Sequence, residues 1–277
     1  MANLTKEHLD FFSTLGIKMH TGLEERKSYG HDETEDFVFP PDLVLIPTKT
    51  EEIASIMRYC NEHAIPVTPA GARTGLSGGC LPIHGGILVS MEKFNSILHI
   101  DTDNLQVTTE PGVITEVLQQ AVKVKGLFYP PDPASKGSCF IGGNVSENSG
   151  GPKAVKYGVT KDYVLNLEVV LPTGEIIWTG ANVLKNATGY NLTQLMVGSE
   201  GTLGIITKIV LRLLPHPTHD VLFLVPFFNA GSACAAVPDI FKAGIIPSGM
   251  EFMEREALLW AKSFTGDETV PVKDSHE

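Results

Sequence analysis

Pro69-Ala-Gly-Ala-Arg-Thr-Gly-Leu-Ser-Gly-Gly79 is the stretch on which the interpretation of this sequence depends. Glycines and small hydroxyl residues dominate it, so little shields the backbone, and successive N–H groups can turn inward around an anion. The stretch follows a β-like run at 65–68, which predicts a loop at the end of a strand. It is neither a P-loop, which closes on Gly-Lys-Ser/Thr, nor the G-x-G-x-x-G dinucleotide fingerprint. Taken alone, it is equally consistent with a flexible surface loop.

Two further glycine-rich segments follow in the chain. The first contains Ile141-Gly-Gly-Asn144 and Glu147-Asn-Ser-Gly-Gly151, and the second is Gly198-Ser-Glu-Gly-Thr-Leu-Gly204. Glycine segments at 69, 141 and 198 meet in one groove only if the ligand is long. A dinucleotide meets this condition, with one loop for its pyrophosphate and the others for a flat ring system and its sugar.

Composition limits the classes of partner. The chain has 277 residues, a net charge of −11 and 43% hydrophobic residues, which fits about one or two globular domains. Nucleic acids and anionic membrane surfaces require basic patches, so neither is expected as a partner. The four widely spaced cysteines indicate reduced thiols. With no leader or long apolar stretch in the sequence, we expect a cytoplasmic protein without a membrane span.

Hydrophobic periodicity predicts a mixed α and β fold. Strand 43–46, a helix capped by Thr50 and strand 65–68 form a βαβ unit, whereas 29–36 is predicted as a surface loop. Further strands are predicted at 86–90, 97–101, 106–110, 164–171, 176–178, 205–214 and 221–225, and further helices at 4–15, 114–124, 230–243 and 257–264. The pieces after Asp220 are too few to bury a core, so they are expected to begin an incomplete second domain.

The order of these motifs resembles the FAD-linked oxidases with a PCMH-type (vanillyl-alcohol oxidase/p-cresol methylhydroxylase) flavin domain, in particular the glycolate oxidase and D-lactate dehydrogenase branch. The motifs at 69–79, 129–133, 141–152, 156–159 and 197–207 carry the resemblance, which covers about residues 29–262. It implies an α+β fold: a helix and lead-in at 1–37, a PCMH-type FAD-binding domain of two α/β subdomains at 38–217, and the truncated start of a C-terminal α+β cap domain at 218–277.

The resemblance also implies which residues bind FAD. They are Pro69, Ala70, Gly71, Ala72, Arg73, Thr74, Gly75, Leu76, Ser77, Pro131, Asp132, Ser138, Gly142, Gly143, Asn144, Asn148, Gly151, Gly158, Glu200, Gly204, Ile205 and Ile206. Structural roles compete at some of these positions: Asp132 can cap a turn between prolines, Gly158 can open a strand, and Ile205 and Ile206 are typical core residues.

The resemblance assigns the loop at 71–77 to the pyrophosphate of FAD, and two details concern this pyrophosphate loop. It contains no His or Cys, and Cys80 and Cys139 fit the role of small buried hydrophobes, so we expect non-covalent FAD. Arg73 departs from the family, where a small residue is commoner. Its guanidinium can pair with a phosphate or simply point to solvent.

The family resemblance implies oxidation of a small 2-hydroxy acid, such as glycolate or D-lactate. The base, the carboxylate clamp and a His/Glu metal site belong to the family's C-terminal domain, so no catalytic or metal-binding residue is predicted in this chain. An electron-acceptor protein or iron–sulfur subunit is a possible partner. The alternative is an FAD-binding module that is inactive without a missing C-terminal domain or partner chain. A remoter alternative is a substrate such as an alcohol or ether-lipid precursor.

Overall fold

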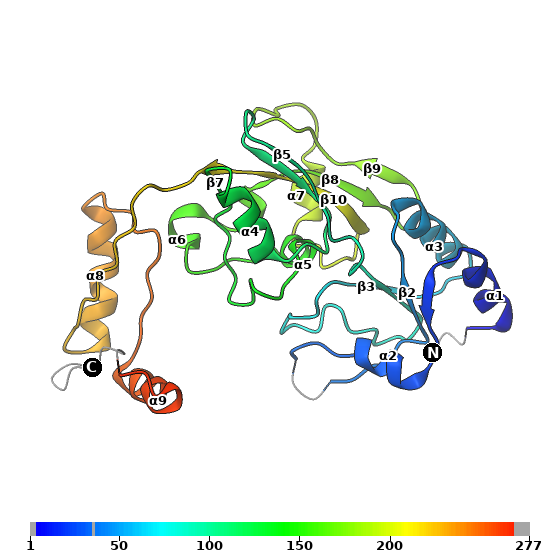
Figure 1. Cartoon of the computed structure of the whole chain (residues 1–277), viewed down its shortest axis with the longest axis horizontal. Helices are drawn as coiled ribbons and strands as arrows, with labels where there is room; N and C mark the ends of the chain where they lie inside the picture. The colour runs from blue at the N-terminus through cyan, green and yellow to red at the C-terminus, as the bar shows by residue number, and fades with distance from the viewer. Residues whose placement is uncertain (1–3, 35–36, 269–277) are drawn as a thin grey trace. The chain divides into compact units, whose positions relative to one another are not determined.

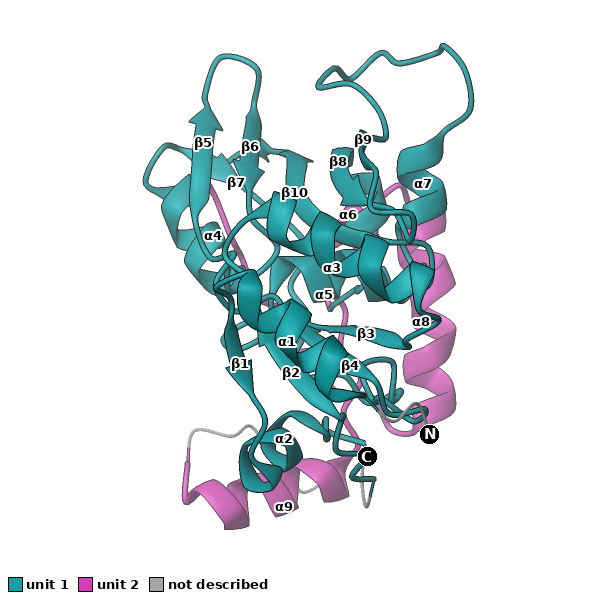
Figure 2. Ribbon diagram, turned by 90° about the vertical axis from the view of Figure 1, so that its right-hand side faces the viewer, with its two compact units in different colours: residues 1–151, 159–216 teal, residues 152–158, 217–277 magenta. Residues whose placement is uncertain are grey.

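The computed structural model describes residues 4–34 and 37–268 and divides into two compact units. Unit 1 comprises residues 1–151 and 159–216, and unit 2 comprises residues 152–158 and 217–277 (Figure 2). Residues 1–3 and 35–36 of the predicted lead-in, and 269–277 of the predicted last domain, lie outside the described residues. The domain boundaries at 37/38 and 217/218 stay predictions.

The first sheet of unit 1 follows the predicted βαβ unit (Figure 1). Its order is β1 (Lys18–His20), β2 (Leu43–Ile46), β4 (Ile87–Ser90) and β3 (Val67–Ala70). Strands β2 and β3 both run parallel to β4, which lies between them, and α3 (Thr50–Glu62) connects β2 to β3. The continuous apolar run of β2 is explained because all four of its residues are buried. Helices α1 (Lys6–Thr14) and α2 (Leu23–Tyr29) complete this part.

The second sheet is antiparallel throughout, in the order β5 (Ile97–Asp101), β6 (Gln106–Thr109), β10 (Ile205–Arg212), β8 (Val164–Val170) and β9 (Ile176–Trp178). Unit 1 also contains the helices α4 (Thr115–Lys123), α5 (Ile141–Glu147) and α7 (Leu192–Met196) and the 3₁₀ helix η1 (Thr160–Asp162). A short antiparallel pair is formed by β7 (Leu127–Phe128) and β11 (Leu214–Pro215). The mixed α/β fold class is therefore confirmed.

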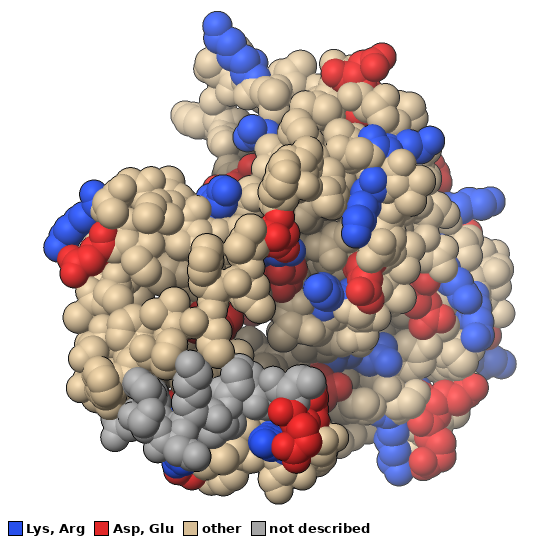
Figure 3. Space-filling model, turned by 60° about the vertical axis from the view of Figure 1, so that its left-hand side comes forward, with Lys and Arg blue, Asp and Glu red and all other residues tan. Residues whose placement is uncertain are grey.

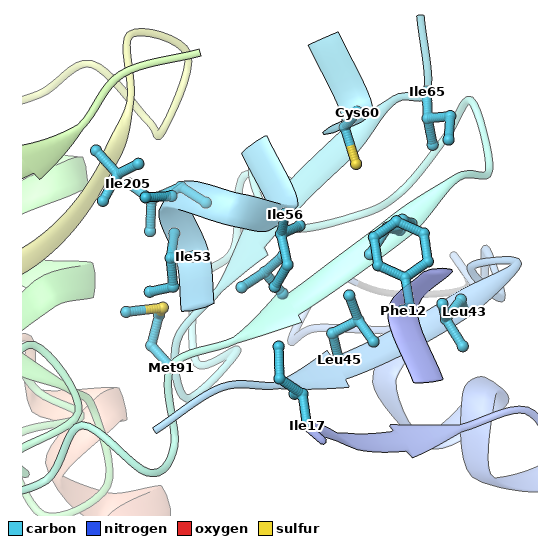
Figure 4. Close-up of a cluster of buried hydrophobic side chains, with 14 of the residues drawn as sticks. Phe12, Ile17, Leu43, Leu45, Ile53, Ile56, Cys60, Ile65, Met91 and Ile205 are labelled. Carbon is cyan, nitrogen blue, oxygen red and sulfur yellow. The ribbon is translucent and has the colours of Figure 1, made fainter. Parts of the chain in front are cut away.

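One hydrophobic core joins the two sheets of unit 1. Ile53, Ile56 and Cys60 recur along one face of α3 and are buried together with Phe12 of α1. Ile205 of β10 belongs to the same cluster and lies next to Ile53 (Figure 4). Helix α3 therefore packs against both sheets and fixes them relative to each other.

The start of α3 differs from the prediction. Lys49, not Thr50, is the N-cap, and the Glu52 carboxylate accepts hydrogen bonds from the backbone N–H groups of Thr48 (2.7 Å) and Lys49 (3.2 Å). Since Glu52 binds these donors, the Thr50 hydroxyl is available for a distant partner. It donates a 3.1 Å hydrogen bond to the Glu168 carboxylate on β8, in the other sheet.

Unit 2 contains α6 (Ala154–Tyr157), α8 (Ala230–Lys242) and α9 (Arg255–Thr265). The predicted strand at 221–225 is wrong: no strand is assigned there, and each of its side chains is at least 61% exposed. An apolar run forms a strand only where another strand pairs with it, and the described part of unit 2 offers none.

Charged side chains of both signs are scattered over the face drawn in Figure 3. On the face drawn in Figure 3, leaving the grey atoms aside, Lys and Arg are mixed with Asp and Glu and do not gather into one basic area. Among the described residues, we find no helix with the length and apolar character needed to cross a membrane.

Candidate cofactor-binding site

A cavity in unit 1 lies among all three glycine-rich segments. Its volume is about 970 Å³, including the open solvent at its mouth, and its walls contain 69–75, 142–144 and 204–206. Most of the predicted FAD-binding residues line it, namely Pro69, Ala70, Gly71, Ala72, Arg73, Thr74, Gly75, Gly142, Gly143, Asn144, Glu200, Gly204, Ile205 and Ile206. The predicted residues that are not among its described lining residues are Leu76, Ser77, Pro131, Asp132, Ser138, Asn148, Gly151 and Gly158.

The first wall is the loop that leaves the carboxyl end of β3. Ligands of parallel sheets commonly bind at this end of the strands. Gly71 approaches the second glycine segment closely, since a Cβ added there would lie 3.9 Å from the Gly143 backbone nitrogen. Arg73 has φ +59°, a left-handed conformation that is strained for a side-chain-bearing residue. Leu76 is 76% exposed, which agrees with its place outside the cavity.

The second wall is a helix, α5, where the sequence had indicated only bare backbone around Gly142 and Gly143. The two glycines have different surroundings. A Cβ at Gly142 would lie 2.5 Å from Pro111 Cβ, whereas a Cβ at Gly143 would meet no atom within 4 Å. Gly142 therefore permits close packing of α5, and Gly143 leaves space open at the cavity.

Asn144 anchors α5 to α4. Its side-chain amide donates a 2.6 Å hydrogen bond to the Thr115 hydroxyl, and that hydroxyl lies 3.2 Å from Cys139 Sγ. Both Asn144 and Cys139 are buried and line the cavity. The Asn144 amide nitrogen thus holds α5 against α4, at a position that also lines the cavity.

The third wall leads into β10. Glu200 and Gly201 both have positive φ values, and the Glu200 N–H donates to the Ser146 carbonyl of α5 (3.0 Å). At Gly204 a Cβ would lie 2.7 Å from Val169 Cγ1, so this glycine serves packing within the sheet. Ile205 and Ile206 are buried, which agrees with the alternative prediction that they are core residues.

Several predicted residues contribute to other parts of the fold. Asn148 is the left-handed C-cap of α5, and its side-chain carbonyl accepts a hydrogen bond from Lys161 N–H (2.9 Å). Gly151 packs against the backbone of Asp132, where an added Cβ would lie 2.4 Å from the carbonyl oxygen. Gly158 belongs to unit 2. Their roles in FAD binding stay predictions.

The sequence interpretation missed an acidic part of the cavity wall, formed by Asp32 and Glu147 beside Glu200. Burial raises the pKa of the Glu147 carboxyl above its ordinary value, and the charges of Glu200 and Asp32 raise it further. Asp32 Oδ2 also lies 3.9 Å from Cys80 Sγ, and burial together with this carboxylate raises the pKa of the Cys80 thiol to about 11. Glu147 is the last residue of α5 and stands within the second glycine-rich segment, but its sequence context does not show that its carboxylate faces a cavity.

We expect removal of the Glu147 charge to stabilise the ligand-free fold, because the pKa of this carboxyl is raised. Because the folded state holds the proton more tightly than the unfolded state, ionisation of Glu147 destabilises the fold as the pH rises through and above the usual Glu range of about 4.3. Glu147→Gln should therefore melt at a higher temperature than the unsubstituted chain at about pH 8 and at the same temperature at about pH 4.

Thermal unfolding without added flavin measures this difference. Glu62→Gln, at an exposed position of α3, is the matched control and should follow the unsubstituted chain at both pH values. A melting temperature of Glu147→Gln that is lower than that of the unsubstituted chain at about pH 8 would contradict the interpretation.

Comparison with known proteins shows to which family the chain belongs. Residues 41–180 match the family model described as "FAD binding domain", and residues 216–276 match "FAD linked oxidases, C-terminal domain". The chain is 43% identical over 270 residues to a D-lactate dehydrogenase of Anaerostipes hadrus, covering 97% of this chain and 57% of that protein. It is 47% identical over 234 residues to the glycolate oxidase subunit GlcD of Bacillus subtilis, covering 84% and 50%.

The chain thus spans about half the length of these curated relatives. A solved structure of an alkyldihydroxyacetonephosphate synthase superposes with a TM-score of 0.74 at 21% identity, covering 89% of this chain and 46% of that one. This likeness shows the fold alone. The family matches and the three glycine-rich walls lead to one conclusion: the chain belongs to the FAD-linked oxidase family and carries its FAD-binding domain.

Proposed function

We propose that this chain is the FAD-binding portion of an oxidoreductase that oxidises a small 2-hydroxy acid of the glycolate or D-lactate type. The observation that carries the proposal is the meeting of three distant glycine-rich segments in one cavity of a family FAD-binding domain. The two relatives compared above are named for glycolate and D-lactate, which supports this substrate class.

The residues of the cavity fit FAD. A diphosphate needs backbone N–H groups that it can approach closely, and a flat ring needs a wall without side chains. Gly75 and Gly143 offer such surfaces, because a Cβ added at either would meet no atom within 4 Å. We propose that the lining residues of 69–75, 142–144 and 204–206 hold the cofactor.

We propose that FAD is held without a covalent bond. The described lining residues include two thiols, Cys80 and Cys139, and no histidine. With a pKa of about 11, Cys80 is almost entirely in its unreactive thiol form at neutral pH. Cys139 is buried beside the Thr115 hydroxyl. Neither thiol is poised as a nucleophile toward a flavin.

When bound, FAD supplies the hydride-accepting chemistry, while the protein must provide a base for the substrate hydroxyl and cations for the substrate carboxylate. Among the described lining residues, the side chains able to carry charge are three carboxylates, two thiols and Arg73. The lining thus lacks a histidine or lysine base. We propose, as the family resemblance implies, that the base and the carboxylate clamp come from outside this chain's FAD-binding domain.

The second candidate is an FAD-binding module that needs another polypeptide for turnover. The exposed apolar run at 221–225 favours it, because such a run is suited to pair with strands that the described residues do not supply. In this version a missing C-terminal domain or a partner chain completes the substrate site. An electron-accepting protein is a further partner, since the Bacillus relative is named as a subunit.

Flavin spectroscopy on the purified chain tests these candidates. We expect added FAD to bind, with quenched fluorescence, and to be released on denaturation. Bleaching of bound FAD by glycolate or D-lactate, with a dye as final acceptor, supports the first candidate. FAD binding without bleaching fits both candidates, because the base and the carboxylate clamp are proposed to lie outside this chain's FAD-binding domain. A preparation that binds no FAD overturns both, and flavin that stays on the denatured chain contradicts non-covalent binding.

A further inference from the structure

Arg73 is the basic side chain of the cavity. Among the described lining residues, the other charged groups are the carboxyls of Asp32, Glu147 and Glu200. The diphosphate of FAD is anionic, so these carboxyls disfavour its approach and a cation is needed to offset them. Arg73 lies in the middle of the glycine loop, where a diphosphate would meet the backbone.

The Arg73 side chain also has an unused donor. Its Nε is buried, and no acceptor among the described residues reaches it. A buried N–H without an acceptor destabilises a fold, so the Arg73 side chain is held in this position at a cost in stability. The backbone adds a second unfavourable feature, since φ at Arg73 is +59°, a conformation that glycine would adopt without strain. Two unfavourable features at one cavity residue indicate a side chain retained for a ligand.

Tyr29, at the end of α2, packs its ring against the Arg73 guanidinium. The guanidinium carbon lies 4.7 Å from the centre of the Tyr29 ring, within the range of a cation–π contact. The Tyr29 hydroxyl donates a 3.0 Å hydrogen bond to Glu92, which also accepts one from Ser90 (3.3 Å). The ring is thereby fixed as a platform beneath the arginine.

The segment around Tyr29 is joined to the loop through the backbone as well. The Glu33 N–H donates to the Gly75 carbonyl (3.1 Å), and Asp32 lines the cavity. Tyr29, Asp32 and Glu33 precede position 41, where the match to the family's FAD-binding domain begins. Asp32 is thus a lining residue of the cavity that the family match does not cover, and Tyr29 and Glu33 contact the glycine loop beside it.

We infer that Arg73, supported by Tyr29, binds the diphosphate of FAD through its guanidinium and supplies the cationic contact of this site. The inference depends on the proposed function, because it requires that FAD occupies the cavity. A substrate carboxylate offers the same oxyanion chemistry, but the glycine loop around Arg73 is suited to a diphosphate that approaches backbone N–H groups.

Titration of the full chain with FAD, followed by fluorescence quenching, tests the inference. Arg73→Ala should weaken FAD binding about tenfold or more, as expected for loss of a charge-assisted contact. The dissociation constant of the unsubstituted chain should also rise more steeply between about 50 and 500 mM NaCl than that of Arg73→Ala, since salt screens the lost ion pair. Arg58→Ala, exposed on α3, is the matched control and should bind FAD normally.

Arg73→Gly separates a ligand-binding role from a structural one. Glycine relieves the left-handed backbone, so the flavin-free variant should melt at the same temperature as the unsubstituted chain or higher, while its FAD affinity falls as in Arg73→Ala. A structural role predicts a lower melting temperature. Tyr29→Ala should also weaken FAD binding, and Tyr29→Phe should do so less because the platform remains.

The outcomes distinguish this inference from the proposed function. If the unsubstituted chain binds FAD and Arg73→Ala binds it within about twofold, the inference is wrong and the proposed function stands. The same holds if Arg73→Ala leaves FAD affinity unchanged but removes the spectral response of bound FAD to D-lactate, because Arg73 then serves the substrate. If the unsubstituted chain binds no FAD, both fail.

Discussion

Leucine at position 143 should abolish FAD binding while the fold stays intact. Gly143 lines the cavity, and a Cβ added there would meet no protein atom within 4 Å, so the new side chain can occupy space that we assign to the cofactor. Gly143 lies within α5, where a residue other than glycine favours the helix. We expect at least roughly a 100-fold loss of FAD affinity, or about 3 kcal/mol, and a melting temperature no lower than before.

The neighbouring glycine provides the matched control. A Cβ at Gly142 would lie 2.5 Å from Pro111 Cβ and 3.1 Å from the Pro111 carbonyl oxygen, so Gly142→Ala must displace α5 from its support. Overpacking of this kind destabilises a fold by about 1–3 kcal/mol. Thermal unfolding should therefore separate the two variants, because Gly142→Ala should lower the melting temperature and Gly143→Leu should not. The site assignment is wrong if Gly143→Leu binds FAD as the unsubstituted chain does.

Removal of the Glu168 side chain should cause the second large effect, on stability. This carboxylate is 6% exposed and accepts hydrogen bonds from Thr50 (3.1 Å), Thr207 (2.8 Å) and the Lys208 ammonium (2.9 Å). Glu168→Ala leaves these donors without their partner, and breaking a buried ion pair on one side destabilises by about 3–5 kcal/mol. Since Lys208 is partly exposed, solvent compensates it, and we expect about 2–3 kcal/mol.

Urea unfolding followed by tryptophan fluorescence measures this loss. Trp178 lies on β9 of unit 1 and Trp260 on α9 of unit 2, so a Trp260→Phe background reports on unit 1 alone. Glu168→Gln keeps an acceptor for the two hydroxyls and should lose only about 1 kcal/mol. Glu62→Ala, on the exposed face of α3, should change little. Equal unfolding midpoints for Glu168→Ala and Glu62→Ala would exclude the network as a significant contributor.

The elements that the sequence predicted well have strong local signals. Helix α3 shows apolar residues at helical spacing, and β2 and β4 are short runs of buried aliphatic residues. Helix α5 had no such signal, because its Ile-Gly-Gly-Asn start is typical of a loop, and packing against Pro111 and Thr115 stabilises it instead. The apolar run at 221–225 shows the opposite case: its propensity is that of a strand, but no partner strand is described beside it.

The residues of the cavity also divide into those with a local sequence signal and those without one. Its glycines were found from the sequence because unshielded backbone is a local property that a short motif displays. The acidic residues Asp32 and Glu147 were missed, since an exposed carboxylate and one that faces a cavity look alike in a sequence. Only the fold distinguishes them, by bringing residue 32 beside Cys80 and residue 147 near Glu200.

The sequence by itself determined the family, the FAD-binding class of the domain and the three glycine-rich segments, because each depends on a contiguous motif. Tertiary structure alone decided which side chains meet: Arg73 with Tyr29, and Thr50 with Glu168. These pairs are separated by 44 and 118 positions, and nothing within either local segment specifies its partner. Contacts between distant residues arise only when the sheets and helices pack, because packing brings side chains within hydrogen-bond or ring-stacking distance.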